Sequence, residues 1–151
     1  MEPLYNQKTY YPTKDKLKNE WIVIDSADQV LGRIASKAAN RLMGKHLPIF
    51  QPGATVGDSV IIINASKIKV TGAKLDQKNY YNFSGYRGGL RTVKMRTLYE
   101  NTPEKIVLIA IKGMLPKNKY GRKLLRRVRV FAGAEHNMTA QKAAEVSASI
   151  K

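Results

Sequence analysis

The chain has 151 residues, of which 43% are hydrophobic, a globular composition long enough to bury a substantial core. It carries 27 Lys and Arg against 11 Asp and Glu, which gives a net charge of +16. Such an excess opposes compaction unless an anion neutralises it, so the composition favours a nucleic-acid partner over an anionic membrane surface. Because there is no Cys, disulfides and thiolate metal sites are excluded.

No apolar run approaches the roughly 20 residues that a membrane-spanning helix needs. The first twenty residues also lack the apolar stretch of a signal peptide. We therefore expect a cytoplasmic protein with no membrane partner. We predict an irregular basic arm over residues 1–19, a single α/β core over 20–136, and a peripheral tail of small and polar residues over 137–151.

The first half of the core is predicted to run strand, helix, strand. Trp21–Ile24 and Val60–Ile63 are apolar without alternation, which is typical of strands covered on both faces. Between them, Leu31–Met43 has apolar residues at helical spacing, and Gly44 is expected to end that helix. The alternating stretch Lys67–Thr71 predicts a half-exposed extension of the second strand.

The second half begins with a glycine-containing stretch, Gly72–Arg91, which we interpret as a long loop region, followed by a short helix within Thr92–Asn101. Thr102, Pro103 and Glu104 then form the start signal of a helix over Lys105–Lys112. A strand is the competing interpretation, since this segment is rich in β-branched residues. A short helix and a last strand, Arg127–Phe131, complete an alternating pattern that predicts an α/β fold with a mostly parallel sheet.

Two basic features point to RNA. The segment Lys117–Arg129 holds seven cations and no acid, a density that a polyphosphate backbone neutralises favourably. The predicted helix carries Arg33, Lys37, Arg41 and Lys45 on its other side, each four residues apart, so they form a stripe about 18 Å long. A solvated helix face is the alternative interpretation of this stripe.

The glycine-rich stretch Gly85–Arg91 is either a nest of backbone N–H groups that binds phosphate or a structural turn. Four nearby aromatic residues, Tyr80, Tyr81, Phe83 and Tyr86, are interleaved with cations. Such residues stack on unpaired bases in some RNA-binding proteins, whereas packing in the core is the simpler role.

No catalytic constellation is visible. There are two His, no glycine-rich dinucleotide or P-loop motif, and no nucleophile elbow. Asp25, Asp28 and Asp58 follow or precede predicted strands and are expected to form caps and turns. The remaining enzymatic hypothesis is a small α/β enzyme that acts on a phosphorylated ligand through Asp58 and the stretch Gly85–Arg91. We expect no enzyme, no cofactor, no metal and no small-molecule substrate.

Several short motifs occur in a fixed order along the chain. The most specific block is Lys112–Asn118 followed by Gly121 and Arg122. The other blocks are Trp21–Asp25, Leu31–Ala35, Gly57–Ile61, Asn64–Ala65, Lys69–Gly72, Tyr81–Gly89 and Val130–His136. Over about residues 8–142, this series closely resembles the bacterial-type ribosomal protein L13 family of the large subunit. The chain departs from the family pattern at Pro52–Val56, at Asn82–Phe83, at Arg87 and at Met138.

The resemblance implies a three-layer α/β/α core with a four-stranded parallel sheet. It also implies a structural role in the large ribosomal subunit, with large-subunit rRNA and neighbouring ribosomal proteins as partners and a part in early assembly. Some family members also bind their own mRNA as a secondary role. A free-standing nucleic-acid-binding regulator would use the same basic surface and is the alternative.

The residues predicted to contact RNA are the cations and glycines of these segments together with both histidines. They are Arg33, Lys37, Arg41, Lys45, His46, Arg87, Gly88, Gly89, Arg91, Lys112, Lys117, Lys119, Arg122, Lys123, Arg126, Arg127, Arg129 and His136.

Overall fold

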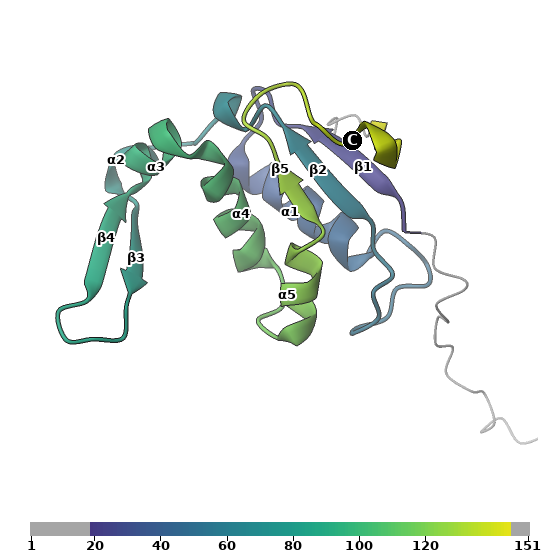
Figure 1. Ribbon diagram of the computed structural model, residues 1–151, viewed down its shortest axis with the longest axis horizontal. Helices are drawn as coiled ribbons and strands as arrows, with labels where there is room; N and C mark the ends of the chain where they lie inside the picture. The colour runs from purple at the N-terminus through teal and green to yellow at the C-terminus, as the bar shows by residue number, and fades with distance from the viewer. Residues whose placement is uncertain (1–18, 146–151) are drawn as a thin grey trace, which may run out of the picture.

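A parallel sheet lies at the centre of the computed structural model, which describes residues 19–145 (Figure 1). Its strand order is β5-β2-β1-β6, formed by Val128–Val130, Ser59–Ile63, Trp21–Asp25 and Ala144–Glu145. Trp21 pairs with Ser59 and Val60 pairs with Val128, and all three pairings in the sheet are parallel. The predicted α/β class and mostly parallel sheet are confirmed.

The apolar runs of β1 and β2 are buried on both faces of the sheet. Ile22 and Ile24 of β1, with Val60 and Ile62 of β2, belong to the main hydrophobic core. Side chains alternate across a strand, so Ile61 points to the opposite face, where it is also buried. This two-sided burial explains why neither run alternates with polar residues.

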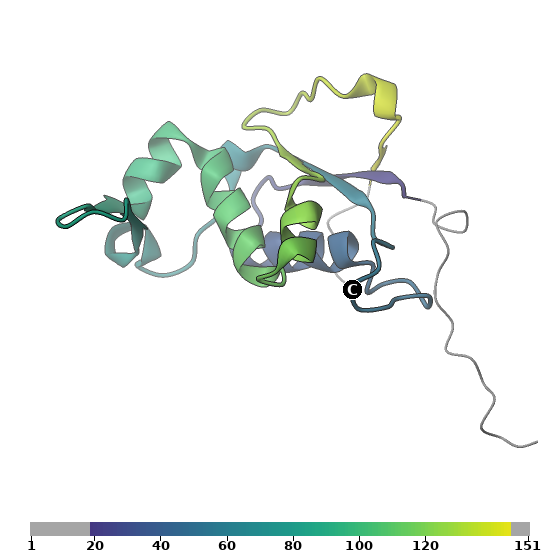
Figure 2. The ribbon, with the colours of Figure 1, turned by 60° about the horizontal axis from the view of Figure 1, so that its bottom comes forward.

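Three helices cover one face of the sheet (Figure 2). These are α1 (Leu31–Met43), α4 (Pro103–Met114) and α5 (Lys119–Leu125). They bury Leu42, Ile111 and Leu124 completely in the shared core. The predicted helices are confirmed, including α4 in place of the competing strand. Pro103 occupies its first turn as expected, although Thr102 makes no side-chain cap hydrogen bond.

The other face of the sheet is covered by the chain after β5 (Figure 2). Within the described residues, this layer holds one turn of 3-10 helix, η4 (Thr139–Gln141), and then strand β6. β6 pairs with Ile22 and Val23 of β1, so Ala144 and Glu145 of the predicted peripheral tail form an edge strand of the sheet. The predicted basic arm lies outside the described residues except for its last residue.

The prediction of a long loop over Gly72–Arg91 is wrong, because this range contains a helix, a strand and the start of a second strand. A short helix α2 (Lys74–Gln77) precedes an antiparallel hairpin of β3 (Asn79–Phe83) and β4 (Leu90–Lys94), and α3 (Met95–Asn101) follows. We call β3, β4 and the residues between them the hairpin. It projects beyond α4, away from the sheet (Figure 1). The high β-propensity of its aromatic and β-branched residues explains the strands.

The predicted extension Lys67–Thr71 is not a strand. A 3-10 turn, η3 (Ala65–Lys67), follows β2, and Lys69 forms a single parallel bridge with Val30 just before α1. The bridge also provides a backbone partner for the start of α1, because the Leu31 N–H donates to the Lys69 carbonyl at 3.0 Å. This link replaces the side-chain cap that α1 lacks.

The end of α1 lies very close to the turn that precedes β2. Gly44 ends the helix in the left-handed conformation, with φ of 77°, as predicted. The Asp58 N–H donates to the Arg41 carbonyl at 3.1 Å. A Cβ atom on Gly57 would lie 2.0 Å from the Leu42 carbonyl oxygen, and one on Gly44 would lie 2.9 Å from the Gly57 nitrogen. Two glycines are therefore needed for this contact.

We expect Gly57→Ala to destabilise the protein, because backbone must move to admit the new methyl group. Overpacking of this kind costs about 1–3 kcal/mol of the free energy of unfolding. Urea denaturation measures the effect. Gly32→Ala is the control, since Gly32 lies in α1 with no atom within 4 Å of the added Cβ. A Gly57→Ala variant as stable as Gly32→Ala would contradict the close contact.

Candidate nucleic-acid interface

Cations gather where the strands of the parallel sheet begin. β1, β2 and β5 all start at this edge, and α1 and α4 run in the opposite sense and end there (Figure 1). We call this part of the molecule the basic end. Its cations are Arg41, Lys45, Lys112, Lys117, Lys119, Arg122, Lys123, Arg126 and Arg127.

Two of these cations lie in the last turns of long helices. Arg41 is in the last turn of α1 and Lys112 is in that of α4. The carbonyl end of a helix carries a partial negative charge, so cations there are stabilising. That interaction offsets part of the repulsion within the basic end, but it leaves the guanidinium and ammonium groups able to bind an anion.

The connection from α4 to α5 presents the most cationic segment. The Asn118 side chain caps α5 by accepting a hydrogen bond from the Gly121 N–H at 2.9 Å. Gly121 packs against Pro116, whose carbonyl oxygen would lie 1.8 Å from a Cβ at Gly121. The Tyr120 hydroxyl donates to the Ala54 carbonyl at 2.8 Å, which ties α5 to the chain before β2.

These contacts hold α5 in place while its charged side chains stay in solvent. Around Asn118 and along α5, Lys117, Lys119, Arg122, Lys123 and Arg126 are all exposed. A groove of 590 Å³ lies between α4 and α5, and Lys112, Lys117 and Arg122 are among its lining residues. An extended anion can therefore reach several cations at once.

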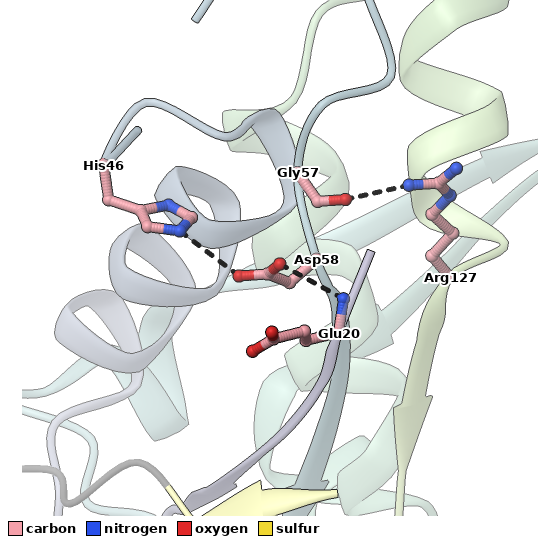
Figure 3. Close-up of polar contacts among 5 residues, drawn as sticks. All are labelled: Glu20, His46, Gly57, Asp58 and Arg127. Carbon is pink, nitrogen blue, oxygen red and sulfur yellow. Dashed lines mark hydrogen bonds and ion pairs between the residues drawn. The ribbon is translucent and has the colours of Figure 1, made fainter. Parts of the chain in front are cut away.

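Two polar links join the basic end to the start of β2 (Figure 3). The Arg127 guanidinium donates to the Gly57 carbonyl at 2.9 Å. On the other side of the same turn, His46 Nε2 lies 3.3 Å from Asp58 Oδ2, and Asp58 Oδ1 accepts from the Glu20 N–H at 3.5 Å. Arg127 and His46 are thus structural residues as well as predicted RNA contacts.

The pKa of His46 is lowered from its ordinary value. Burial against the turn is the largest cause and the positive charge of Arg41 is the second, and together they outweigh Asp58, which acts in the opposite direction. Burial and Arg41 therefore disfavour the charged form of His46, although its Nε2 lies beside the Asp58 carboxylate.

The basic end contains few acids. Asp58 is buried at 6% exposure, which leaves Glu20 as the exposed acid beside it. At the opposite edge of the sheet, where β1 ends, acids and cations are more evenly mixed. There Asp28 pairs with Lys69 at 3.0 Å, and the pKa of Asp25 is lowered, chiefly by a hydrogen bond from Asn64. The molecule is therefore electrostatically polarised along its strands.

The structure does not bring all predicted contact residues together. Arg33 lies in the first turn of α1 and Lys37 one turn further on, so both are displaced along the helix from the basic end. Arg129 alternates with the buried Val128 and points to the other face of the sheet, where its guanidinium donates to the carbonyls of Arg126 and Val128. His136 lies beyond β5, with its ring 6.3 Å from that of Phe131.

The hairpin carries the remaining predicted contact residues, which are Arg87, Gly88, Gly89 and Arg91. Gly88 has φ of 71°, and a Cβ on Gly89 would lie 2.9 Å from the Tyr86 carbonyl oxygen, so the turn itself favours glycine at both positions. This turn chemistry accounts for the pair without an RNA contact. The role of the group in RNA binding stays a prediction.

The hairpin does not meet Asp58. Asp58 precedes β2 at the basic end, whereas the hairpin projects on the far side of α4 (Figure 1). The enzymatic hypothesis required these two parts to form one site, and the fold separates them. Within residues 19–145, no group of three or more His, Asp or Glu side chains is placed to hold a metal ion. No helix in this range is long and apolar enough to cross a membrane.

Comparison with known proteins agrees with this arrangement. The family model described as ribosomal protein L13 matches residues 19–137. The chain belongs to the ribosomal protein L13 family. The match begins just before β1 and ends after β5, so it includes the whole basic end and the hairpin.

Curated L13 relatives are similar over nearly their full length. A protein of Nitratidesulfovibrio vulgaris strain Hildenborough, named large ribosomal subunit protein uL13, is 49% identical over 89% of this chain and 94% of its own. Proteins with the same name from Syntrophobacter fumaroxidans and Pseudomonas putida are 46% and 45% identical, and cover 93% and 92% of this chain.

Sequence reasoning missed two features of the site. One is the pairing of His46 with Asp58, which are twelve residues apart and meet only because α1 packs beside β2. The other is the anchoring of α5 by Tyr120. Asn118 was detectable, since Asn is a favoured N-cap residue just before a helix. The hairpin also had a local signal, namely two aromatic or β-branched runs that flank a Ser-Gly and Gly-Gly turn.

We expect acid to destabilise the protein through His46. The pKa of His46 is lower in the folded state than in the unfolded state, so the unfolded state binds a proton more readily and acid favours unfolding. The contribution of neutral His46 is complete above the unfolded pKa of about 6.5 and is lost as pH falls below that value. Comparing urea unfolding at pH 7.5 and 5.5 should show a smaller loss for His46→Gln than for the wild type.

An NMR titration of the His46 ring provides the direct check on this prediction. His136→Gln serves as the matched control for the stability measurements. A His46 pKa above that of an unfolded peptide would show that Asp58 dominates over burial, and would reverse the expected sign.

Proposed function

We propose that this chain is a structural constituent of the large ribosomal subunit that binds large-subunit rRNA through the basic end. The proposal includes neighbouring ribosomal proteins as partners, a part in early subunit assembly, and a location in cytoplasmic ribosomes. We propose no catalytic role for it.

The observation that carries the proposal is the similarity to proteins named for the large subunit. These relatives match about nine-tenths of this chain and nearly all of their own length. At 45–49% identity, the fold is expected to be shared.

The geometry of the basic end supports RNA as the ligand. Its exposed cations come from α4, α5 and the turn after α1, so they spread over a surface and are not focused on one small cavity. A polyphosphate backbone presents charge at the same regular intervals, and its counterions are released on binding. A small phosphorylated ligand would contact only a few of these cations.

A free-standing regulator that binds RNA, or binding of the chain's own mRNA, would use the same cations. Fractionation of a cell lysate on a sucrose gradient separates the first of these from our proposal. We expect the protein to co-migrate with large subunits. A pool that stays at the top of the gradient would contradict the ribosomal role.

RNA binding by the isolated protein should depend steeply on salt. If the basic end and the neighbouring stripe on α1 engage about 6–10 phosphates, the slope of log K against log salt is roughly −4 to −9, depending on how much of the target is single-stranded. Fluorescence anisotropy at several salt concentrations measures it. A slope shallower than about −2 would show that this surface is not the binding face.

Arg122 and Arg126 are expected to contribute most, because a guanidinium binds phosphate with two parallel hydrogen bonds. Arg122→Gln with Arg126→Gln should weaken binding and make the salt slope shallower by about 1.4–1.8. The charge-matched control is Lys67→Gln with Lys105→Gln, both exposed near the opposite edge of the sheet.

A further double variant compares lysines with arginines. The loss of RNA affinity for Lys37→Gln with Lys45→Gln should lie between the losses for the two double variants above. Equal losses for the arginine pair and the opposite-edge lysine pair would mean that binding reflects net charge alone.

A further inference from the structure

We propose that the outer face of the hairpin is a stacking platform for unpaired bases of RNA. The platform consists of Tyr81, Phe83 and Leu90 on the strands and Tyr86 in the turn between them. This inference rests on the proposed RNA-binding function and adds a second mode of contact, in which bases rather than phosphates are bound.

The strand register places these side chains on one face. Phe83 pairs with Leu90 and Tyr81 pairs with Thr92. Opposite residues of an antiparallel pair project from the same face, and so do residues two apart along a strand. Tyr81, Phe83 and Leu90 therefore share a surface.

The other face of the hairpin is turned towards the body of the protein. Tyr80 pairs with Val93 there, and both are partly buried. Tyr80 lines a second groove, of 550 Å³, together with Ile109 and Met114 of α4, and Lys78 Nζ lies 5.3 Å from the centre of its ring. Packing thus accounts for Tyr80 but not for the residues of the outer face.

The outer face is unusually exposed for its composition. Tyr81 is 67% exposed, Phe83 63%, Tyr86 80% and Leu90 58%. Among the described residues, these are the four most exposed large hydrophobic side chains, and all four belong to the hairpin. A cluster of this kind on a projecting element marks a binding surface, since folding alone leaves it in water.

The charges around the platform identify the occupant as a polyanion. Between Lys78 and Tyr99 there are five cations, namely Lys78, Arg87, Arg91, Lys94 and Arg96, and no acid. Arg96 is paired with Asp76 at 2.7 Å, and the other four lie along or beside the hairpin. Such a field repels a basic protein and gives no reason for an uncharged one, whereas it attracts a phosphate backbone.

The spacing of the aromatic residues suits nucleotide bases. Two residues along a strand advance about 6.8 Å, roughly twice the 3.4 Å rise between stacked bases. Tyr81 and Phe83 can therefore stack with successive unpaired bases. Arg87 in the turn and Lys94 at the other end of the hairpin are then available to the backbone on either side. Duplex bases are already stacked on one another and cannot use this surface.

The test uses the full chain and three RNA probes: a uridine dodecamer, a ribose-phosphate strand of the same length without bases, and a twelve-base-pair duplex. Tyr81→Leu with Phe83→Leu keeps apolar side chains in the strand but removes both aromatic rings. We expect this variant to bind the dodecamer at least about tenfold more weakly, and to bind the other two probes as the wild type does.

Two variants control for indirect effects. Phe50→Leu removes an exposed aromatic ring outside the hairpin and should change nothing. Exchanging the two rings, with Tyr81→Phe and Phe83→Tyr, keeps both aromatic side chains and should leave the affinity for the dodecamer at the wild-type value. Circular dichroism verifies that each variant is folded.

If the leucine variant binds the dodecamer as tightly as the wild type, the stacking platform is overturned. If the duplex still depends on Arg122 and Arg126 in that case, the proposed function stands without it. If the wild type binds none of the three probes at low salt, both proposals fail.

Discussion

The contact between Gly57 and the last turn of α1 is the constraint on which the basic end depends. There is no room for a side chain between the Gly57 backbone and the Leu42 carbonyl. The same turn accepts a hydrogen bond from Arg127 and places Asp58 beside His46. A single short segment thus sets the positions of the end of α1, the start of β2 and the junction between α5 and β5.

Concentrating cations has a cost that the fold reduces in three ways. Arg41 and Lys112 lie in the last turns of α1 and α4, where the partial negative charge of the helix end stabilises them. The lowered pKa of His46 disfavours a further positive charge. The buried Asp58 supplies a negative charge close to the cations. The remaining repulsion persists in the free protein. Binding of RNA, as proposed, would relieve this repulsion, so folding and RNA association are expected to stabilise one another.

The basic end and the hairpin differ in what they offer a nucleic acid. The first lies on three helices that pack on the sheet, an arrangement suited to phosphates on a structured RNA. The second projects away from the core and carries exposed aromatic rings. The hairpin and α5 lie on either side of α4 (Figure 1), so one RNA molecule that contacts both must pass across that helix.

Local patterns in the sequence were enough to predict β1, β2, α1 and α4, because apolar periodicity, glycine stops and Pro103 act within a few residues. They did not predict β6, a two-residue strand whose partner in β1 is more than a hundred residues away. The charge of Lys117–Arg129 was visible in the sequence. Its separation from Arg33, and the turning of Arg129 to the other face, depend on how the helices and strands pack.

Lysine acetylation in intact large subunits, compared with the isolated protein, tests the central claim most directly. Exposed lysines of the basic end, Lys117, Lys119 and Lys123, should react readily in the isolated protein and be protected in the subunit. Lys67 and Lys105, near the opposite edge of the sheet, should be protected less. The reverse pattern, with the basic end reactive and the opposite edge protected, would contradict the claim that the basic end is the surface that faces RNA.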